Sequence, residues 1–206
     1  MQDERLINSV ELIQDKLLDW FIDHGRHWIP WKLKQDGLKP SPNELLSPYG
    51  IWIAEVMLQQ TQLKVAIPFW DKWMKTFPTL ESLSDSGLED ILFLWQGLGY
   101  YSRARYIYQA SKILINVVGE NSFLDYSRWP FELHQWIALP GIGRSTAGSI
   151  ISSAFNSPAS ILDGNVRRVL SRLIANPSSK DHKRLWAAST RLLPTHNPRD
   201  FNQALM

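Results

Sequence analysis

The chain of 206 residues contains no cysteine, and this absence excludes several kinds of site. Disulfide bonds and thiolate metal ligands both require cysteine, so neither is available within these residues. The five histidines are scattered without the spacing of a metal site, which favours ordinary surface or packing roles. We therefore expect neither a metal nor a cofactor within this sequence.

Long apolar runs are also missing. No run approaches the roughly 20 apolar residues that a membrane-spanning helix needs. The acidic start Met-Gln-Asp-Glu lacks the apolar centre of a signal peptide. These absences argue against a membrane protein and against an exported one.

The residues that are present are those of a packed globular protein, with 44% hydrophobic residues and ten tryptophans. This length suffices for one domain or two small ones. The net charge of +2 is unevenly spread, since residues 1–99 carry 9 basic and 14 acidic side chains, and residues 100–206 carry 13 and 6. A basic second half suits a polyanionic partner, but an uneven solvated surface explains it equally well.

Nearly every segment with a clear hydrophobic period has the period of a helix, and none alternates convincingly as a strand does. Residues 33–49 contain three prolines and predict a surface loop. Phe201–Met206 has the pattern of an opening helix without a stop signal, so we expect a fragment that ends inside a helix. Pro68 is expected to divide a helix over residues 51–68 from another that runs to residue 77. Further helices are expected over residues 6–22, 88–95, 101–118, 131–138, 144–155, 166–175 and 182–193.

The stretch Leu139-Pro-Gly-Ile-Gly-Arg-Ser-Thr-Ala-Gly148 predicts two helices joined by a tight turn. Gly141 and Gly143 can adopt positive φ at little cost, which allows the chain to reverse. The unpaired amides at the start of the second helix suit a phosphate. Asp163 follows, directly before a helix that carries Arg167, Arg168 and Arg172. This combination suggests an enzyme that holds DNA and acts on one nucleotide.

Two carboxylates are candidates for the chemistry. Glu55 lies among apolar residues of the segment 51–58, where desolvation would raise its pKa and let it donate a proton. Periodicity alone favours an exposed helix glutamate instead. Asp163 would stay ionised and stabilise a sugar cation, although a helix N-cap or a hairpin turn is the commoner role.

Two polar segments are candidates for nucleic-acid contacts. The amides of Gln59, Gln60 and Gln62, beside Thr61, could reach base edges or fill the gap left by an extruded base. Gly97–Arg105 places paired tyrosines next to two arginines, which suits stacking together with phosphate contact. Solvent-facing helix residues and an ordinary helix entry explain the two segments as well.

Taken together, these segments resemble the helix-hairpin-helix DNA glycosylase superfamily, and within it the adenine DNA glycosylase (MutY) family. The resemblance runs from about residue 12 to the last residue. The matching blocks are Leu17-Leu-Asp-Trp-Phe with Ile29-Pro-Trp31, Glu55-Val-Met-Leu-Gln-Gln-Thr-Gln62, Phe77-Pro-Thr, Leu94-Trp-Gln-Gly-Leu-Gly-Tyr-Tyr-Ser-Arg-Ala-Arg105, Leu139 to Ile150, Ile161 to Leu170 and Phe201 to Met206.

The resemblance implies an all-α, two-lobed helix-hairpin-helix fold with the active site in the cleft between lobes. Residues 50–160 would form the central lobe, with the hairpin at about 133–155, and residues 1–49 and 161–206 the other lobe. The implied activity is hydrolysis of the N-glycosidic bond of adenine mispaired with 8-oxoguanine or guanine. The enzyme would be a monomer that acts on double-stranded DNA in the bacterial cytoplasm, at the nucleoid, without a membrane.

The resemblance also assigns roles to residues. Glu55 would protonate adenine, Asp163 would stabilise the oxocarbenium-like sugar, and Asn165 would support this pair. Ser145 stands where strand-cutting relatives carry a Schiff-base lysine, and serine cannot form an imine, which implies a monofunctional enzyme. Ile29 and Trp31 would line the base pocket. The DNA contacts would come from Gln59, Gln60 as a wedge, Tyr100 as an intercalating ring, Arg103, Gly141, Gly143, Arg144 and Thr146.

Two features depart from the family pattern. The segment 32–49 is longer than the usual link and is expected to loop out. The family's four-iron four-sulfur cluster and its Nudix-like domain, which reads the oxidised guanine, would lie beyond Met206, so the activity of this chain is expected to be impaired. Two other hypotheses stay open: a sister glycosylase for another mispaired base, and a non-catalytic DNA-binding hairpin module. A base-release assay across mismatches separates them.

Overall fold

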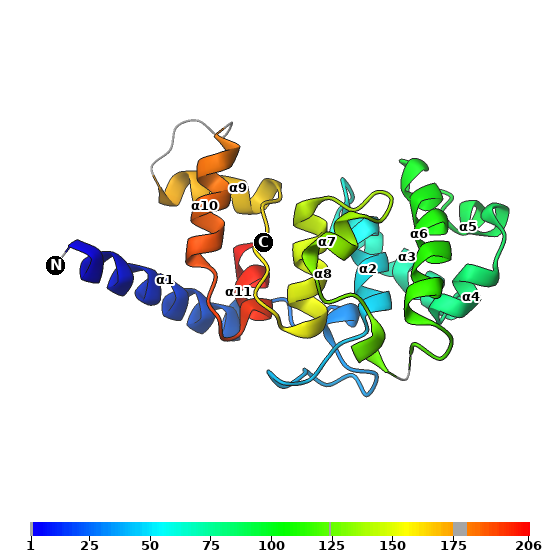
Figure 1. Cartoon of the computed structure of the whole chain (residues 1–206), viewed down its shortest axis with the longest axis horizontal. Helices are drawn as coiled ribbons and strands as arrows, with labels where there is room; N and C mark the ends of the chain where they lie inside the picture. The colour runs from blue at the N-terminus through cyan, green and yellow to red at the C-terminus, as the bar shows by residue number, and fades with distance from the viewer. Residues whose placement is uncertain (1, 124, 175–180) are drawn as a thin grey trace.

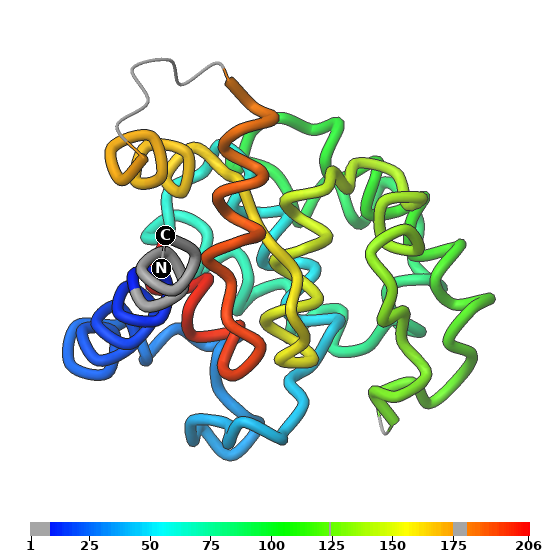
Figure 2. The backbone as a smooth tube through the Cα atoms, turned by 60° about the vertical axis from the view of Figure 1, so that its left-hand side comes forward, coloured from blue at the N-terminus to red at the C-terminus, as the bar shows by residue number. Residues whose placement is uncertain are grey.

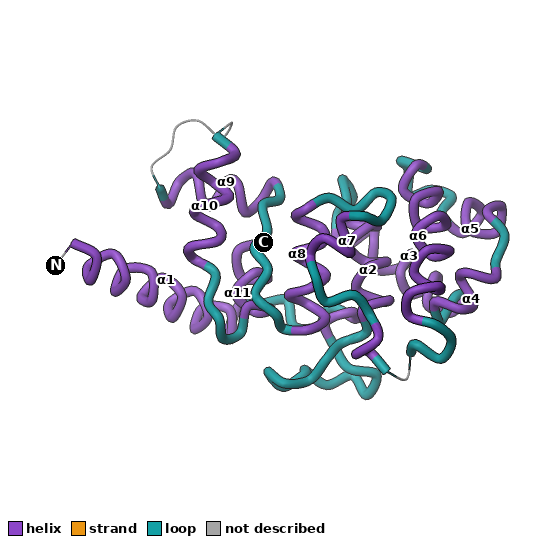
Figure 3. Tube along the Cα trace, in the orientation of Figure 1, coloured by secondary structure: helices purple, strands orange, loops and turns teal. Residues whose placement is uncertain are grey.

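The computed structural model describes residues 2–123, 125–174 and 181–206, and its regular structure in these ranges is entirely helical (Figure 3). The expected all-α fold class is confirmed. In chain order the elements are α1 (Gln2–His24), η1 (Pro30–Lys32), α2 (Pro48–Leu58), α3 (Leu63–Thr76), α4 (Leu80–Asp85), α5 (Leu88–Leu94), α6 (Ser102–Val118), η2 (Tyr126–Arg128), α7 (Leu133–Ile137), α8 (Arg144–Phe155), α9 (Gly164–Leu173), α10 (His182–Leu192) and α11 (Pro198–Leu205).

The buried apolar side chains form two clusters. The larger core contains residues between Ile29 and Phe155, contributed by η1 and helices α2 to α8. The smaller core contains residues between Ile161 and Leu205, and apolar side chains of α1 pack against it. Figures 1 and 2 show the result: α1 lies beside α10 and α11 at one end of the molecule, with α3 to α6 at the other end.

The boundary between the two cores differs from the expected one. We placed residues 1–49 with the C-terminal helices, but the buried side chains of Ile29, Trp31, Leu46 and Tyr49 belong to the larger core. The ring of Trp31 contacts that of Trp70 in α3, with centroids 5.5 Å apart. Apolar contact of this kind, rather than sequence order, decides which core a segment joins.

The expected helix break at Pro68 is wrong. Helix α2 ends at Leu58, and α3 continues through Pro68 to Thr76. The break lies at Gln60, whose φ of +60° cannot continue a right-handed helix. Pro68 has no N–H to donate, so α3 lacks one main-chain hydrogen bond there, but the helix continues. The side chain of Pro68 is exposed.

Helix ends differ from the expected ones by a few residues elsewhere. Helix α4 was not expected, although Thr79 and Ser82 form a capping box at its start. Helix α11 begins at Pro198, three residues before the expected position. The expected end of the 166–175 helix at Ala175 lies outside the described residues.

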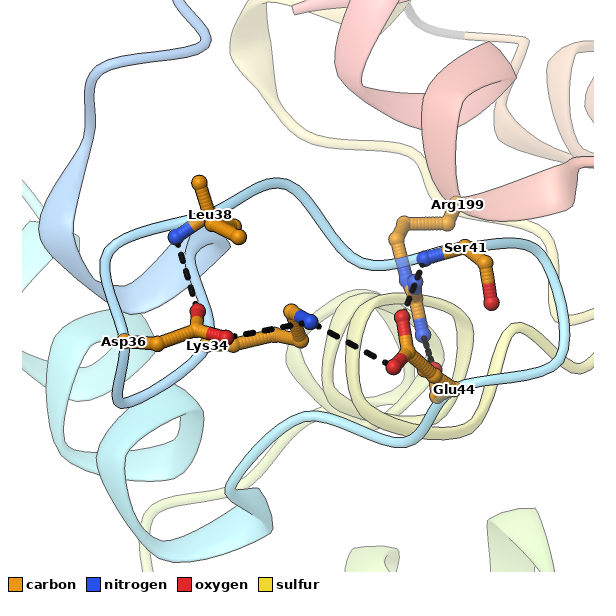
Figure 4. Close-up of polar contacts among 6 residues, drawn as sticks. All are labelled: Lys34, Asp36, Leu38, Ser41, Glu44 and Arg199. Atoms are coloured by element: carbon orange, nitrogen blue, oxygen red, sulfur yellow. Dashed lines mark hydrogen bonds and ion pairs between the residues drawn. The ribbon is translucent and has the colours of Figure 1, made fainter.

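The long segment between η1 and α2 forms a loop fixed by polar contacts (Figure 4). Lys34 Nζ lies 3.2 Å from Asp36 Oδ2 and 3.4 Å from Glu44 Oε1. Arg199 of α11 donates from Nη2 to the main-chain oxygen of Glu44 at 2.8 Å. Ser47 then caps α2 by accepting from the N–H of Gly50. The loop is thus attached to α11 and delivers the chain to the start of α2.

Candidate active site

A cavity of about 570 Å³ is lined by residues of both cores. Its walls come from η1, the end of α2, the turn after it, α8, the start of α9 and the end of α11. Ile29 and Trp31 from the larger core and Ile161 from the smaller core contribute to the lining. Of the residues predicted from the sequence, the cavity brings together Glu55, Asp163, Asn165, Ser145, Gln59, Gln60, Thr146, Ile29 and Trp31.

Glu55 stands on α2, whose other residues from Pro48 to Met57 are all buried. Burial raises the pKa of its carboxyl from 4.5 to about 7, because the charged form loses hydration. The hydroxyl of Ser149 opposes this rise, the negative charge of Asp163 adds to it, and the ammonium of Lys32 opposes it. A carboxyl with this pKa holds a proton near neutral pH and can donate it.

Two hydrogen bonds fix Asp163, one made by its own side chain and one by the main chain of the residue before it. Its Oδ1 accepts from the N–H of Val166 at 2.7 Å, so Asp163 is the N-cap of α9. The preceding residue, Leu162, donates its N–H to Ser145 Oγ at 2.9 Å. Asn165 accepts from Arg168 Nη2 at 3.1 Å and also lines the cavity. The carboxylate therefore faces the same cavity as Glu55 on a backbone with little freedom.

Gly148 allows this arrangement. A Cβ at Gly148 would collide with the main-chain oxygen of Ser160, which lies three residues before Asp163. Helix α8 and the segment 160–162 are therefore closer together than any side chain at position 148 permits. The Ser145 hydrogen bond to Leu162 depends on this close approach.

The predicted hairpin is present as α7, a tight turn and α8. Gly141 has a φ of +76°, as expected, whereas Gly143 has an ordinary φ of −87°. The expectation of positive φ at Gly143 is therefore wrong, because one left-handed residue suffices for the turn. Gly143 is the N-cap of α8 and makes no side-chain cap, so the first amides of α8 have no capping side chain.

Thr146 and Arg144, both on α8, contact side chains of other elements. Gln59 donates from Nε2 to Gly141 O at 3.3 Å and to Thr146 Oγ1 at 3.4 Å, which links the end of α2 to the hairpin. The guanidinium of Arg144 lies 4.0 Å from the ring centroid of Trp186 in α10. These contacts join the hairpin to the larger and the smaller core.

Tyr100, Arg103, Gly141, Gly143 and Arg144 are not among the residues that line the cavity. Tyr100 is 60% exposed, as a residue that meets DNA must be. Arg103 is only 5% exposed, and its guanidinium donates to protein oxygens. The expected phosphate contact by Arg103 is therefore replaced by an internal role.

The cavity also contains residues that the sequence did not single out. Ser149 stands one turn after Ser145 on α8, a spacing that could have identified it. Lys32 and Arg26 flank the Ile29–Trp31 block, and burial, with the charge of Arg26, lowers the pKa of Lys32 to about 8. Gln203 arrives from α11, which only the tertiary fold brings here.

Among the described residues there is no group of three or more histidine, aspartate and glutamate side chains that could hold a metal ion. The whole sequence lacks cysteine. No helix in the described ranges is long and apolar enough to cross a membrane.

Solved structures with the same fold include DNA glycosylases. A thermostable thymine-DNA glycosylase aligns with a TM-score of 0.76 at 24% identity over 98% of this chain and 86% of that one. A trapped endonuclease III–DNA covalent intermediate aligns with a TM-score of 0.69 at 21% identity, over 96% of this chain and 83% of that one. At these identities the likeness concerns the fold alone.

Curated sequences are more similar. The adenine DNA glycosylase of Buchnera aphidicola subsp. Baizongia pistaciae is 43% identical over 195 residues, covering 92% of this chain and 50% of the relative. The human adenine DNA glycosylase is 36% identical over 206 residues, covering 98% of this chain and 36% of the relative. The chain thus spans half or less of these relatives' length.

A family model described as the HhH-GPD superfamily of base excision DNA repair proteins matches residues 53–195. This range includes Glu55, the hairpin and Asp163, and it covers more than half of the sequence. The chain belongs to the HhH-GPD superfamily of base excision DNA repair proteins.

Proposed function

We propose that the chain is the catalytic part of a DNA glycosylase that hydrolyses the N-glycosidic bond of adenine mispaired with 8-oxoguanine or guanine. The observation that carries the proposal is the pairing of Glu55, with its pKa near 7, and Asp163 in one cavity. The similarity to adenine DNA glycosylases supports adenine as the base. The substrate would be DNA in the bacterial cytoplasm, bound by a single copy of the chain.

In the proposed reaction the adenine leaves the stack and enters the cavity beside Ile29 and Trp31. Glu55 donates its proton to a ring nitrogen of adenine as the bond from the base to the sugar C1′ breaks. The bonding electrons leave with the neutral adenine, and the sugar is left with a positive charge. Protonation makes adenine a better leaving group, which is the contribution expected of a general acid.

Asp163 would stabilise the sugar cation through its negative charge. A water molecule then adds to C1′ and releases a proton, which restores the acid form of Glu55. The products are free adenine and an abasic sugar. Ser145 cannot form an imine with that sugar, so strand cleavage is not part of the proposed reaction.

The family that the chain resembles has a four-iron four-sulfur cluster. The residues present do not fit this cluster, because its ligands would be cysteines and the sequence has none. No step of the proposed reaction depends on it. A domain that reads the oxidised guanine would likewise lie outside this sequence.

The test is single-turnover base release by the purified chain on duplexes containing A opposite 8-oxoguanine, A opposite G, A opposite C, or T opposite G. We expect free adenine from the first two and no thymine. Release of another base would support a sister glycosylase instead. Tight duplex binding without release of any base would support a DNA-binding module.

A further inference from the structure

Two exposed residues at the edge of the site have left-handed backbone conformations. Gln60, in the turn between α2 and α3, has a φ of +60°, and Tyr100, before α6, has a φ of +49°. Such values are uncommon for residues other than glycine, so each must be held by its surroundings. These are also the residues that the resemblance assigns to the wedge and to the intercalating ring.

One buried guanidinium joins the two loops that carry these residues. Arg103 Nη1 donates to the main-chain oxygens of Val56 at 3.0 Å, Met57 at 2.8 Å and Gln59 at 2.5 Å. These are the last carbonyls of α2 and the residue directly before Gln60. The positive charge therefore lies at the C-terminus of α2, where it is favoured, and fixes the start of the first loop.

The other terminal nitrogen of Arg103 reaches both loops. Its Nη2 donates to Thr61 Oγ1, Leu98 O and Gly99 O, each at 3.2 Å. Thr61 follows Gln60 directly, and Gly99 directly precedes Tyr100. The six hydrogen bonds thus surround Gln60 on both sides and fix the residue before Tyr100.

Ring contacts complete the connection to Tyr100. The Arg103 guanidinium lies 5.5 Å from the Tyr100 ring centroid and 5.2 Å from that of the buried Trp95. Trp95 in turn donates from Nε1 to Gly99 O at 2.9 Å. The planar fork of arginine makes these bonds and stacks at the same time, which a lysine cannot do.

We propose that Arg103 is a positioning residue that fixes Gln60 and Tyr100 as one rigid pair, so that adenine extrusion and contact with the opposite base occur together. The identity of the substrate rests on the proposed function. Arg103 itself is 5% exposed, and its two terminal nitrogens donate to protein oxygens. Its role is to fix the separation and direction of the side chains of Gln60 and Tyr100.

The test uses Arg103→Lys in the full chain, with Arg191→Lys as the matched control. Arg191 is an exposed arginine of α10 that does not line the cavity, so the same change of side chain there leaves the two loops untouched. The probe is a duplex with 2-aminopurine in place of the target adenine, because its fluorescence rises on extrusion. We expect Arg103→Lys to slow extrusion on the order of 10- to 100-fold, as small misplacements do, and Arg191→Lys to leave it unchanged.

Three further readouts separate positioning from other roles. In Arg103→Gln, which removes the charge, the slope of log Kd against log salt should match the wild type, since a lost phosphate contact would lower it by about 1. The pH midpoint of base release should also be unchanged. In a chain that already carries Gln60→Ala and Tyr100→Ala, Arg103→Lys should have little additional effect on extrusion. A reduced salt slope, or an undiminished effect in that background, would overturn the proposal.

Extrusion is measured without base release, so the inference can be tested even where no adenine is hydrolysed. If Arg103→Lys does not fold, as judged by circular dichroism, Tyr100→Ala and Gln60→Ala provide the alternative. Both leave Arg103 in place, and the proposal requires that each single change slow extrusion nearly as much as the two changes together, because a rigid pair is lost when either member is lost. Additive small effects of the two would contradict a rigid pair.

Discussion

Ser145 Oγ accepts the main-chain N–H of Leu162 at 2.9 Å, one residue before Asp163. The serine that the resemblance places at the lysine position of strand-cutting enzymes here holds the backbone next to Asp163. Ser145→Ala leaves a buried N–H unpaired, which costs about 1–3 kcal/mol of unfolding free energy. We expect a larger relative loss in single-turnover base release, because Asp163 shifts with Leu162.

Ser145 also predicts the fate of the abasic product. Wild-type protein should give no borohydride-trapped protein–DNA crosslink, because no imine forms at Ser145. Ser145→Lys should gain trapping, since the position lines the cavity. If the wild type traps efficiently, Lys32, which also lines the cavity and has a pKa lowered to about 8, is the amine to remove next. Such trapping would contradict the monofunctional proposal.

The pH dependence of base release should follow Glu55. Its pKa of about 7 means that the acid form predominates below pH 7 and disappears above it. We expect the single-turnover rate to fall as pH rises through about 7, and Glu55→Gln to abolish release while DNA binding is retained. If Glu55→Gln released adenine at a near-normal rate, Glu55 would not be the general acid.

The same carboxyl should destabilise the folded protein at high pH. An unfolded glutamate ionises near pH 4.5 and the folded Glu55 near 7, so unfolding becomes easier as pH rises between these values. A difference of this size corresponds to about 3 kcal/mol once both states are ionised. Glu55→Gln should therefore be as stable as the wild type at pH 4 and more stable at pH 8, by urea unfolding. Equal stability at both pH values would mean that Glu55 is not desolvated.

Asp163 has a structural and a chemical role that substitutions can separate. Asp163→Asn keeps an oxygen for the N–H of Val166, so the cap on α9 remains. Its base-release rate should nevertheless fall on the order of 100- to 1000-fold, because the negative charge is lost. Asp163→Ala should lose the same rate and about 1 kcal/mol of stability besides. If the loss of rate merely followed the fraction of unfolded protein, capping α9 would be the only role of Asp163.

Gly143 is the position at which to test phosphate binding by the hairpin. A Cβ there meets nothing within 4 Å and φ is ordinary, so substitutions should fold. Gly143→Asp should weaken binding about 2- to 5-fold on every duplex, since a charge at a helix N-terminus is worth about 0.3–1 kcal/mol. Gly143→Asn has the same shape without the charge and should bind normally. A loss confined to one mismatch would argue for base contact instead.

The helical fold class and most helices were predictable because their apolar periods and caps are local. The turn at Gln60 was not, since four polar residues in sequence fit an exposed helix face as well as a break. Its left-handed backbone lies between Gln59 and Thr61, both of which accept hydrogen bonds from Arg103, 43 residues further along the chain. Local sequence contains no trace of those bonds.

The residues of the candidate site also differ in whether the local sequence indicates them. The sequence neighbourhood made Glu55 and Asp163 candidates, but on its own it favoured an exposed glutamate and a helix cap. Their proposed roles came from the resemblance. The burial of Arg103 could not be predicted, since its acceptors are carbonyls of distant segments and a basic residue beside tyrosines equally fits a DNA contact. Gln203 lines the cavity only because α11 packs against α8, which no local pattern indicates.

The division of the fold into two apolar cores has a consequence for how substitutions far from the cavity act. Glu55 stands on the larger core, whereas Asp163 begins a helix of the smaller one. A substitution such as Phe201→Ser, in the smaller core and away from the cavity, would move the aspartate while the acid stayed in place. Under the proposed function, such a variant would stay largely folded and bind DNA yet release little adenine. Loss of base release should therefore also map to residues that do not line the cavity.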